Sequence, residues 1–111
     1  MALRKRYNIT GSTGITTELI APGSKVNSLG SILVTNVHAS NAATITLFVE
    51  DAPTASASKN FKIINAVSLP SGTSLILDEP SVLQFDNTAS TSFGLYITVG
   101  ASDTVDVTLG L

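Results

Sequence analysis

The alternation of apolar and polar residues is most regular near the end of the chain. From Phe93 to Val99 every second side chain is apolar, and the same alternation returns from Val105 to Leu111. A period of two places the apolar side chains on one face of a β-strand. The turn-forming residues 100–103, with the sequence Gly-Ala-Ser-Asp, separate the two segments. We therefore predict two strands here and expect them to pair as an antiparallel hairpin.

Further segments carry weaker strand patterns. Ile45, Leu47 and Val49 alternate with threonines, and Phe48 breaks this alternation, which we interpret as an interface or second-face residue. Pro-Gly and Pro-Ser-Gly sequences between the segments are typical of turns. Residues 51–60, which include a proline and alternating Ala and Ser, are expected to form a long loop. Enrichment in β-branched residues predicts the remaining strands, which are 15–21, 31–37, 61–67, 74–78 and 82–85.

About eight short strands with turn sequences between them predict an all-β fold, an antiparallel two-sheet β-sandwich. Jelly-roll and immunoglobulin-like strand orders both fit this pattern. We divide the chain into an N-terminal basic arm, residues 1–13, and a β-sandwich domain, residues 14–111. With the chain divided in this way, we expect the β-sandwich domain to remain folded after removal of residues 1–12.

Charged residues are scarce and unevenly placed. They make up 13% of the 111 residues, against about 25% in an average soluble protein, and Ser, Thr and Asn largely take their place. Three of the six basic residues are Arg4, Lys5 and Arg6, so the rest of the chain sets three lysines against eight carboxylates, a net charge of −5. A charge-poor surface with a basic arm favours a protein that lies against other subunits.

The basic arm has three interpretations. It could dock on an acidic neighbouring subunit, which we favour, or be a solvated terminus, or bind nucleic acid. Nucleic-acid affinity grows with the number of phosphate contacts, and three cations with one neighbouring aromatic side chain provide few, so we do not expect this partner. The candidate subunit-contact residues are Arg4, Lys5, Arg6 and Tyr7.

The chain holds few residues that carry catalytic chemistry. It has no cysteine and a single histidine, His38, which is expected to be a solvent-facing or locally hydrogen-bonded residue at a strand end. No G-x-S-x-G nucleophile motif is present, and the spacing of the acidic pairs matches no calcium-binding loop. We therefore expect no enzyme activity, no metal site and no cofactor.

The apolar runs of the chain are short. None is as long as the apolar region of a signal peptide or of a membrane-spanning helix. We expect a protein made in the cytoplasm that does not associate with a membrane.

Four segments carry a resemblance to a known group of proteins. These are GSILVTN at 30–36, ATITLFV at 43–49, VSLPSGTSLILD at 67–78 and VDVTLGL at 105–111. They resemble strands and turns of small virion structural proteins of tailed bacteriophages, over roughly residues 14–111. The resemblance implies a β-sandwich without catalytic residues, in a group whose members decorate capsids or build neck, collar and tail parts.

The sequence and this resemblance together define the expected function. We expect a non-enzymatic capsid decoration or accessory protein that docks through its sheet edges and its basic arm. Its expected partners are other virion proteins, either the major capsid protein or neck and tail proteins, and copies of itself. A neck, collar or tail protein and a host-surface or glycan-binding module are the alternatives. The expected location is the virion, after synthesis in the host cytoplasm.

Overall fold

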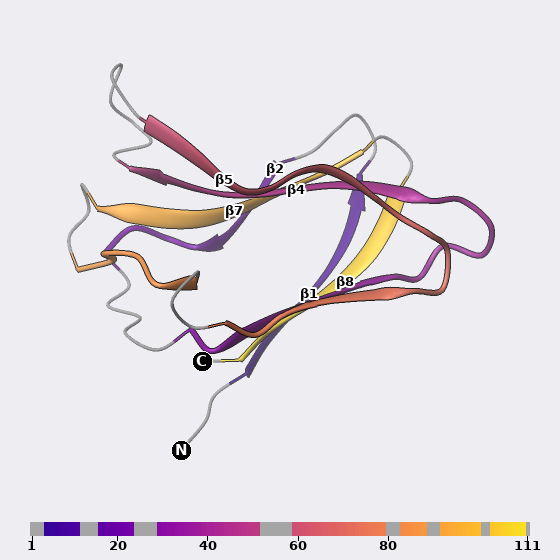
Figure 1. Cartoon of the computed structure of the whole chain (residues 1–111), viewed down its shortest axis with the longest axis horizontal. Coiled ribbons are helices and arrows are strands. Elements are labelled where there is room, and N and C mark those ends of the chain that lie inside the picture. The colour runs from indigo at the N-terminus through magenta and orange to yellow at the C-terminus, as the bar shows by residue number, and fades with distance from the viewer. Residues whose placement is uncertain are drawn as a thin grey trace.

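The computed structural model describes residues 4–11, 16–23, 29–51, 59–79, 83–88, 92–100 and 103–110. Its eight strands form two four-stranded antiparallel sheets that lie one above the other (Figure 1). The predicted two-sheet antiparallel β-sandwich is therefore confirmed. The first sheet has the order β1 (Arg4–Gly11), β8 (Asp103–Gly110), β3 (Ser31–Asn36) and β6 (Ser74–Leu77), and the second has the order β2 (Thr16–Ile20), β7 (Phe93–Val99), β4 (Ala43–Asp51) and β5 (Lys59–Leu69).

The strand order follows from nested pairing. The first strand pairs with the last, β2 with β7, β3 with β6, and β4 with β5. Two further pairings, β3 with β8 and β4 with β7, join these pairs into the two sheets. This is the strand order of an eight-stranded jelly roll, so the jelly-roll alternative holds and the immunoglobulin-like one does not.

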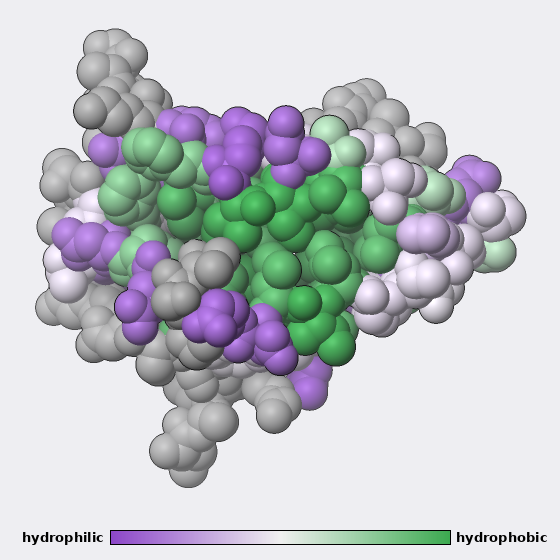
Figure 2. Space-filling model, in the orientation of Figure 1, coloured by the Kyte–Doolittle hydropathy of each residue, from purple (hydrophilic) through white to green (hydrophobic). Residues whose placement is uncertain are grey.

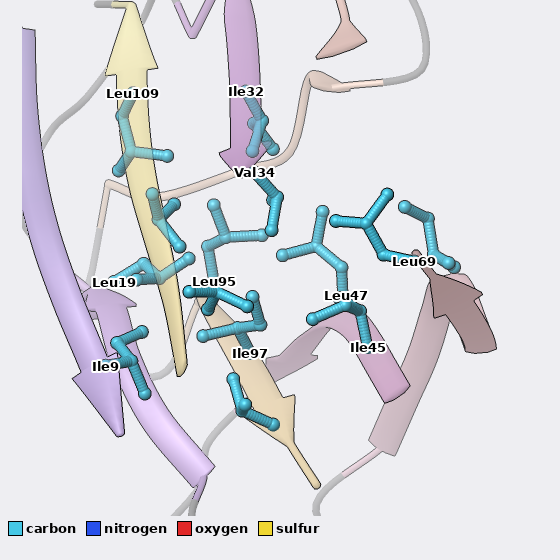
Figure 3. Packing of buried hydrophobic residues seen from close by; sticks show 14 of the residues in the cluster. Ile9, Leu19, Ile32, Val34, Ile45, Leu47, Leu69, Leu95, Ile97 and Leu109 are labelled. Carbon is cyan, nitrogen blue, oxygen red and sulfur yellow. The ribbon is translucent and has the colours of Figure 1, made fainter. Parts of the chain in front are cut away.

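The core lies between the inner faces of the two sheets. Leu95 and Ile97 of β7 face Val105 and Val107 of β8 across it, and all four side chains are fully buried. Figure 3 shows side chains from both sheets meeting in one layer. Removing apolar surface from water stabilises the fold by roughly 25 cal/mol per Å², so these rows hold the two sheets together.

The predicted hairpin between residues 93–99 and 105–111 is wrong. Both segments are strands, but β7 pairs with β2 and β4, and β8 pairs with β1 and β3. The short connection between them crosses from one sheet to the other. Alternation showed correctly which side chains point inward, but it carries no information on which sheet a strand joins.

The predicted strand at 82–85 is also wrong. Gln84 and Phe85 lie in an irregular segment, and Leu83 fills part of the core from it with 1% of its surface exposed. Its apolar pattern therefore reflects burial of a connection. Of the predicted loop 51–60, Asp51 ends β4 and residues 59–60 begin β5, while residues 52–58 lie outside the described residues.

The sandwich includes part of the predicted arm. Arg4–Gly11 forms β1 and pairs with β8 of the same chain from Arg4 opposite Gly110 to Gly11 opposite Asp103. Ile9 belongs to the core cluster. The fold therefore begins before the predicted boundary at residue 14, and removal of residues 1–12 would strip β8 of a strand rather than leave the body intact.

A buried amide, Asn36, joins three parts of the molecule at the end of β3. Its Nδ2 donates to the carbonyl oxygens of Asn41 at 2.8 Å and Leu69 at 2.9 Å. Its Oδ1 accepts the backbone N–H of His38 at 2.9 Å. Because the Asn36 side chain and its bond to the Leu69 carbonyl are buried, this carbonyl would lose its partner without gaining water. Asn36 thus ties β3 to the following turn and to the end of β5.

We expect Asn36→Ala to lower the free energy of unfolding by about 2–4 kcal/mol, since it leaves the buried Leu69 carbonyl unpaired and removes two further hydrogen bonds. Urea unfolding followed by circular dichroism measures the change. The neighbouring variant Thr35→Val is the control. It removes an exposed hydroxyl contact to Ser74 and should cost less than about 1 kcal/mol. Equal losses in the two variants would contradict the role given to Asn36.

Candidate assembly surfaces

The predicted contact residues lie on an edge strand. Among the described strands, β1 forms one edge of the first sheet and pairs only with β8. The side chains of Lys5 and Arg6 are exposed, and the side chain of Arg4 lies outside the described residues. An edge strand presents unpaired backbone groups to any chain that docks beside it. The structure therefore places two exposed cations along an open sheet edge.

Tyr7, the fourth predicted contact residue, has a structural role. Its phenol Oη donates to the backbone carbonyl of Leu19 in β2 at 2.7 Å, and this bond joins the two sheets. Burial, and then the nearby carboxylate of Glu18, raise the pKa of Tyr7 above its usual value. The ring closes the side of the sandwich between β1 and β2, so Tyr7 is less available to a partner than Lys5 and Arg6.

A shallow hollow of about 510 Å³ with both polar and apolar lining lies on the first sheet. Its lining includes Arg6 and Asn8 of β1 and Asp106 and Thr108 of β8. Asn8 Nδ2 donates to Asp106 Oδ1 at 2.5 Å. The cation of Arg6 and the carboxylate of Asp106 therefore line the same hollow, and the basic strand already lies beside an acidic residue of its own chain.

The outer face of the second sheet carries a row of four side chains. Glu18, Tyr96, Phe48 and Lys62 come from its four strands in order and are aligned by the strand register. Tyr96 Oη donates to Glu18 Oε2 at 3.2 Å. The Phe48 and Tyr96 rings stack with centroids 5.6 Å apart, and Lys62 Nζ lies 5.2 Å from the centroid of Phe48. Stacked rings between a carboxylate and an ammonium stabilise this sheet across all its strands.

This row was only partly foreseen. Phe48 was expected to be an interface or second-face residue because it interrupts an alternating strand, and it does lie on the outer face of β4, with 7% of its surface exposed. Its partner Tyr96 comes from a distant part of the chain. No signal within either segment pairs the two rings, because their pairing follows from the strand order.

The imidazole of His38 makes hydrogen bonds within its own turn, while the backbone carbonyl of His38 accepts the hydroxyl of Ser71. Its Nδ1 accepts the backbone N–H groups of Ser40 at 3.1 Å and Asn41 at 3.0 Å and so orders the turn after β3. This agrees with the expected locally hydrogen-bonded histidine. Within the described ranges, no three His, Asp or Glu side chains gather as they would around a metal ion.

No family model matches this sequence, and a search of curated proteins finds no match. Two chains from solved virus structures align with this chain. A chain in the structure of infectious bursal disease virus, Gx strain, aligns with 98% of this chain at 12% identity and a TM-score of 0.41. A chain in the crystal structure of the T13 IBDV viral particle aligns with 97% of this chain at 16% identity and a TM-score of 0.41.

The chain spans about a third of the length of each of these viral chains, 33% and 31%. In the part of the chain that the structure describes, no helix is long and apolar enough to cross a membrane.

We expect Tyr7→Phe to lower the free energy of unfolding by about 1 kcal/mol, because it removes the hydrogen bond that ties β1 to Leu19. Arg6→Gln should change it by less than about 0.5 kcal/mol, since Arg6 is exposed. Urea unfolding measures both values. Amide hydrogen exchange should show faster exchange in β1 for the tyrosine variant only, and equal protection in both variants would refute the assignment.

The two tyrosines should titrate differently from free tyrosine. Burial, followed by the charge of Glu18, raises the pKa of Tyr96 from 10.0 to about 12. The folded state therefore holds this proton more tightly than the unfolded state, so the stabilisation is complete below pH 10 and is lost as the pH rises towards 12. Phenolate absorbance should show this late titration, and Tyr96→Phe should remove it. A titration near pH 10 in the folded protein would contradict the environment described.

Proposed function

We propose that this chain is a non-enzymatic structural component of a virion, a capsid decoration or accessory protein of the tailed-phage type. The observation that carries the proposal is the jelly-roll strand order, an architecture used by viral capsid domains as well as by lectins and cupins. A fold alone does not assign a function. The proposal therefore also relies on the sequence resemblance to virion proteins and on the charge-poor surface.

Docking in this proposal uses the edge strand β1. Its outer backbone edge can accept a strand from a neighbouring protein by β-augmentation. Lys5 and Arg6 are exposed along this strand, and together with Arg4 they would favour an acidic partner surface and set the orientation of docking. The partners are the major capsid protein or neck and tail proteins, together with copies of this chain.

A glycan-binding module is the second candidate, because the hollow on the first sheet is lined by groups that bind sugar hydroxyls. Arg6, Asn8 and Asp106 supply donors and acceptors there. Tyr7 is the aromatic side chain in the lining. Saturable binding on a glycan array that Asp106→Ala abolishes would favour this candidate over a purely structural role.

The main test is the presence and copy number of the protein in purified virus particles, measured by quantitative mass spectrometry. A decoration protein should be present at on the order of hundreds of copies, and a closed ring in the neck or tail at about six to twelve. Absence from particles would overturn the proposal.

The role of β1 is tested by the triple variant Arg4→Ser, Lys5→Ser, Arg6→Ser. It should keep the unfolding midpoint of the wild type and reduce incorporation into particles at least about tenfold, because it removes the charges that attract an acidic partner. Lys25→Ser, a charge change outside β1, is the control and should leave incorporation unchanged. Normal incorporation of the triple variant would show that these charges do not dock the protein.

A further inference from the structure

The four edge strands of the two sheets differ in how well they can accept a further strand. β2 has five residues and a register shift between Glu18 and Ile20. β6 has four residues. β5 is long, but its pairing with β4 shifts register twice, and Ala66 within it has a positive φ of 52°. Short strands and bulges of this kind hinder the addition of a strand.

β1 is the regular edge among the described strands. Its eight residues, Arg4 to Gly11, pair with consecutive residues of β8 without a register shift. Outside this pairing, the backbone of β1 forms no hydrogen bond to another described residue. The free edge of β1 therefore offers an uninterrupted row of backbone groups.

Hydrogen bonds of β8 show which of its residues face β1. The carbonyl oxygen of Thr104 accepts the N–H of Val37 at 3.2 Å, and that of Gly110 accepts the N–H of Gly30 at 2.7 Å. Both oxygens therefore point to the β3 side of β8. Because successive residues of an antiparallel strand direct their backbone groups to alternate sides, residues 105, 107 and 109 direct theirs to β1.

The backbone of β1 alternates in the same way. Tyr7 and Ile9 lie opposite residues 107 and 105 of β8 and therefore bond to that strand. The N–H and carbonyl groups of Arg6, Asn8 and Thr10 then point away from β8, at intervals of about 7 Å along the free edge. A strand laid beside β1 can exchange hydrogen bonds with each of these three residues.

The same three residues expose their side chains. Arg6, Asn8 and Thr10 are all exposed, and they lie on the outer face of the first sheet because the alternate residue Ile9 is buried in the core. In Figure 2 hydrophobic residues are gathered in the middle of the molecule, with hydrophilic residues above and below them, where Figure 1 shows the two sheets. A strand added beside β1 would therefore place every second side chain in a polar, solvated row.

The exposed cations of β1 lie on both faces of the sheet. Lys5 and Arg6 are neighbours in the sequence and are both exposed, and neighbouring residues of a strand point to opposite faces. β1 contains no carboxylate to balance them. Two carboxylates at successive positions of an added strand can pair with both cations. Two carboxylates at alternate positions share one face and can pair with only one.

We propose that the free edge of β1 binds an extended acidic segment of a partner protein. This segment pairs with the backbone of Arg6, Asn8 and Thr10 and sets two successive carboxylates beside Lys5 and Arg6. The inference rests on the proposed function and names the chemistry of the docking partner within it. Backbone pairing supplies the affinity, and the two carboxylates set the position of the segment along the edge.

The first test is amide hydrogen exchange of the full chain alone, followed residue by residue by NMR. The amides of Arg6, Asn8 and Thr10 should exchange at least about tenfold faster than those of Tyr7 and Ile9, because only the latter two bond to β8. Equal protection along β1 would show that the edge is not free and would overturn the proposal.

The second test uses a synthetic peptide of about ten residues, the length of a long β-strand. It consists of serine and threonine, with two adjacent glutamates at its centre. It should bind the full chain with a dissociation constant on the order of 100 µM at low salt. On binding, hydrogen exchange should slow at Arg6, Asn8 and Thr10 and stay unchanged at Tyr7 and Ile9, since only the first three gain hydrogen bonds.

Two further peptides separate strand pairing from simple charge attraction. An isomer whose two glutamates are separated by one residue has the same charge and composition, and it should bind about threefold to fivefold more weakly, the effect of one exposed ion pair. A version in which all backbone amides are N-methylated keeps both carboxylates. It should lose measurable binding, because it cannot donate hydrogen bonds to β1.

Variants of the chain test the two cations. Lys5→Ser and Arg6→Ser should each weaken binding of the peptide with adjacent glutamates about threefold to fivefold. Both side chains are exposed, so both variants should keep the unfolding midpoint of the wild type. Lys62→Ser is the matched control. Lys62 is an exposed lysine on β5 in the second sheet, and its replacement should leave the affinity unchanged.

Three outcomes of the binding tests would overturn the proposal. They are no binding of the peptide with adjacent glutamates at millimolar concentration, equal affinity for its isomer, and equal affinity for the N-methylated version. Each would leave the proposed function standing, because a protein that binds none of these peptides can still be found in virus particles. Absence from particles, in turn, would overturn the proposed function and not the pairing measured with peptides.

Discussion

The nested pairing of strands across the whole chain is the constraint on which the rest of this structure depends. The first described strand, β1, pairs with the last, β8, so the fold closes only when residues at opposite ends of the chain meet. Pairings of such long sequence separation cost chain entropy before they gain any contact. The inner apolar rows offset this cost, because each nested pair contributes both of its strands to the same sheet and so builds part of one inner face. Pairing and core formation are therefore one event.

This constraint explains which features the sequence could predict. Period-two alternation identified strands within 93–99 and 105–111 and showed which of their side chains point inward, since that depends only on neighbouring residues. Their partners depend on strand order, so the predicted hairpin was wrong although both strands were right. The jelly-roll order needed the three-dimensional structure, because the alternation in each strand fits an immunoglobulin-like order equally well.

β1 was interpreted as an arm because its charges concealed a strand pattern. Arg4, Lys5 and Arg6 interrupt the alternation, and only Tyr7 and Ile9 continue an inward-facing row. An edge strand at a sheet margin can hold cations in water on its exposed side while it buries one or two side chains. The contact residues predicted from the sequence thus include two exposed cations and one structural tyrosine.

The position of the candidate docking surface limits how loss of docking can be separated from loss of folding. The candidate docking surface, the β1 edge, is built from a strand that also forms the fold. Deletion of β1 would remove Ile9 from the core and expose a new edge on β8, so loss of docking would follow from loss of structure. Exposed side chains such as Arg6 and Ile76 make few contacts within the fold, and substitution there changes a surface while leaving the backbone pairing in place. In a jelly roll with so few charges, the edge strand proposed to dock other subunits also completes the sandwich, and only substitution of single exposed side chains separates the two roles.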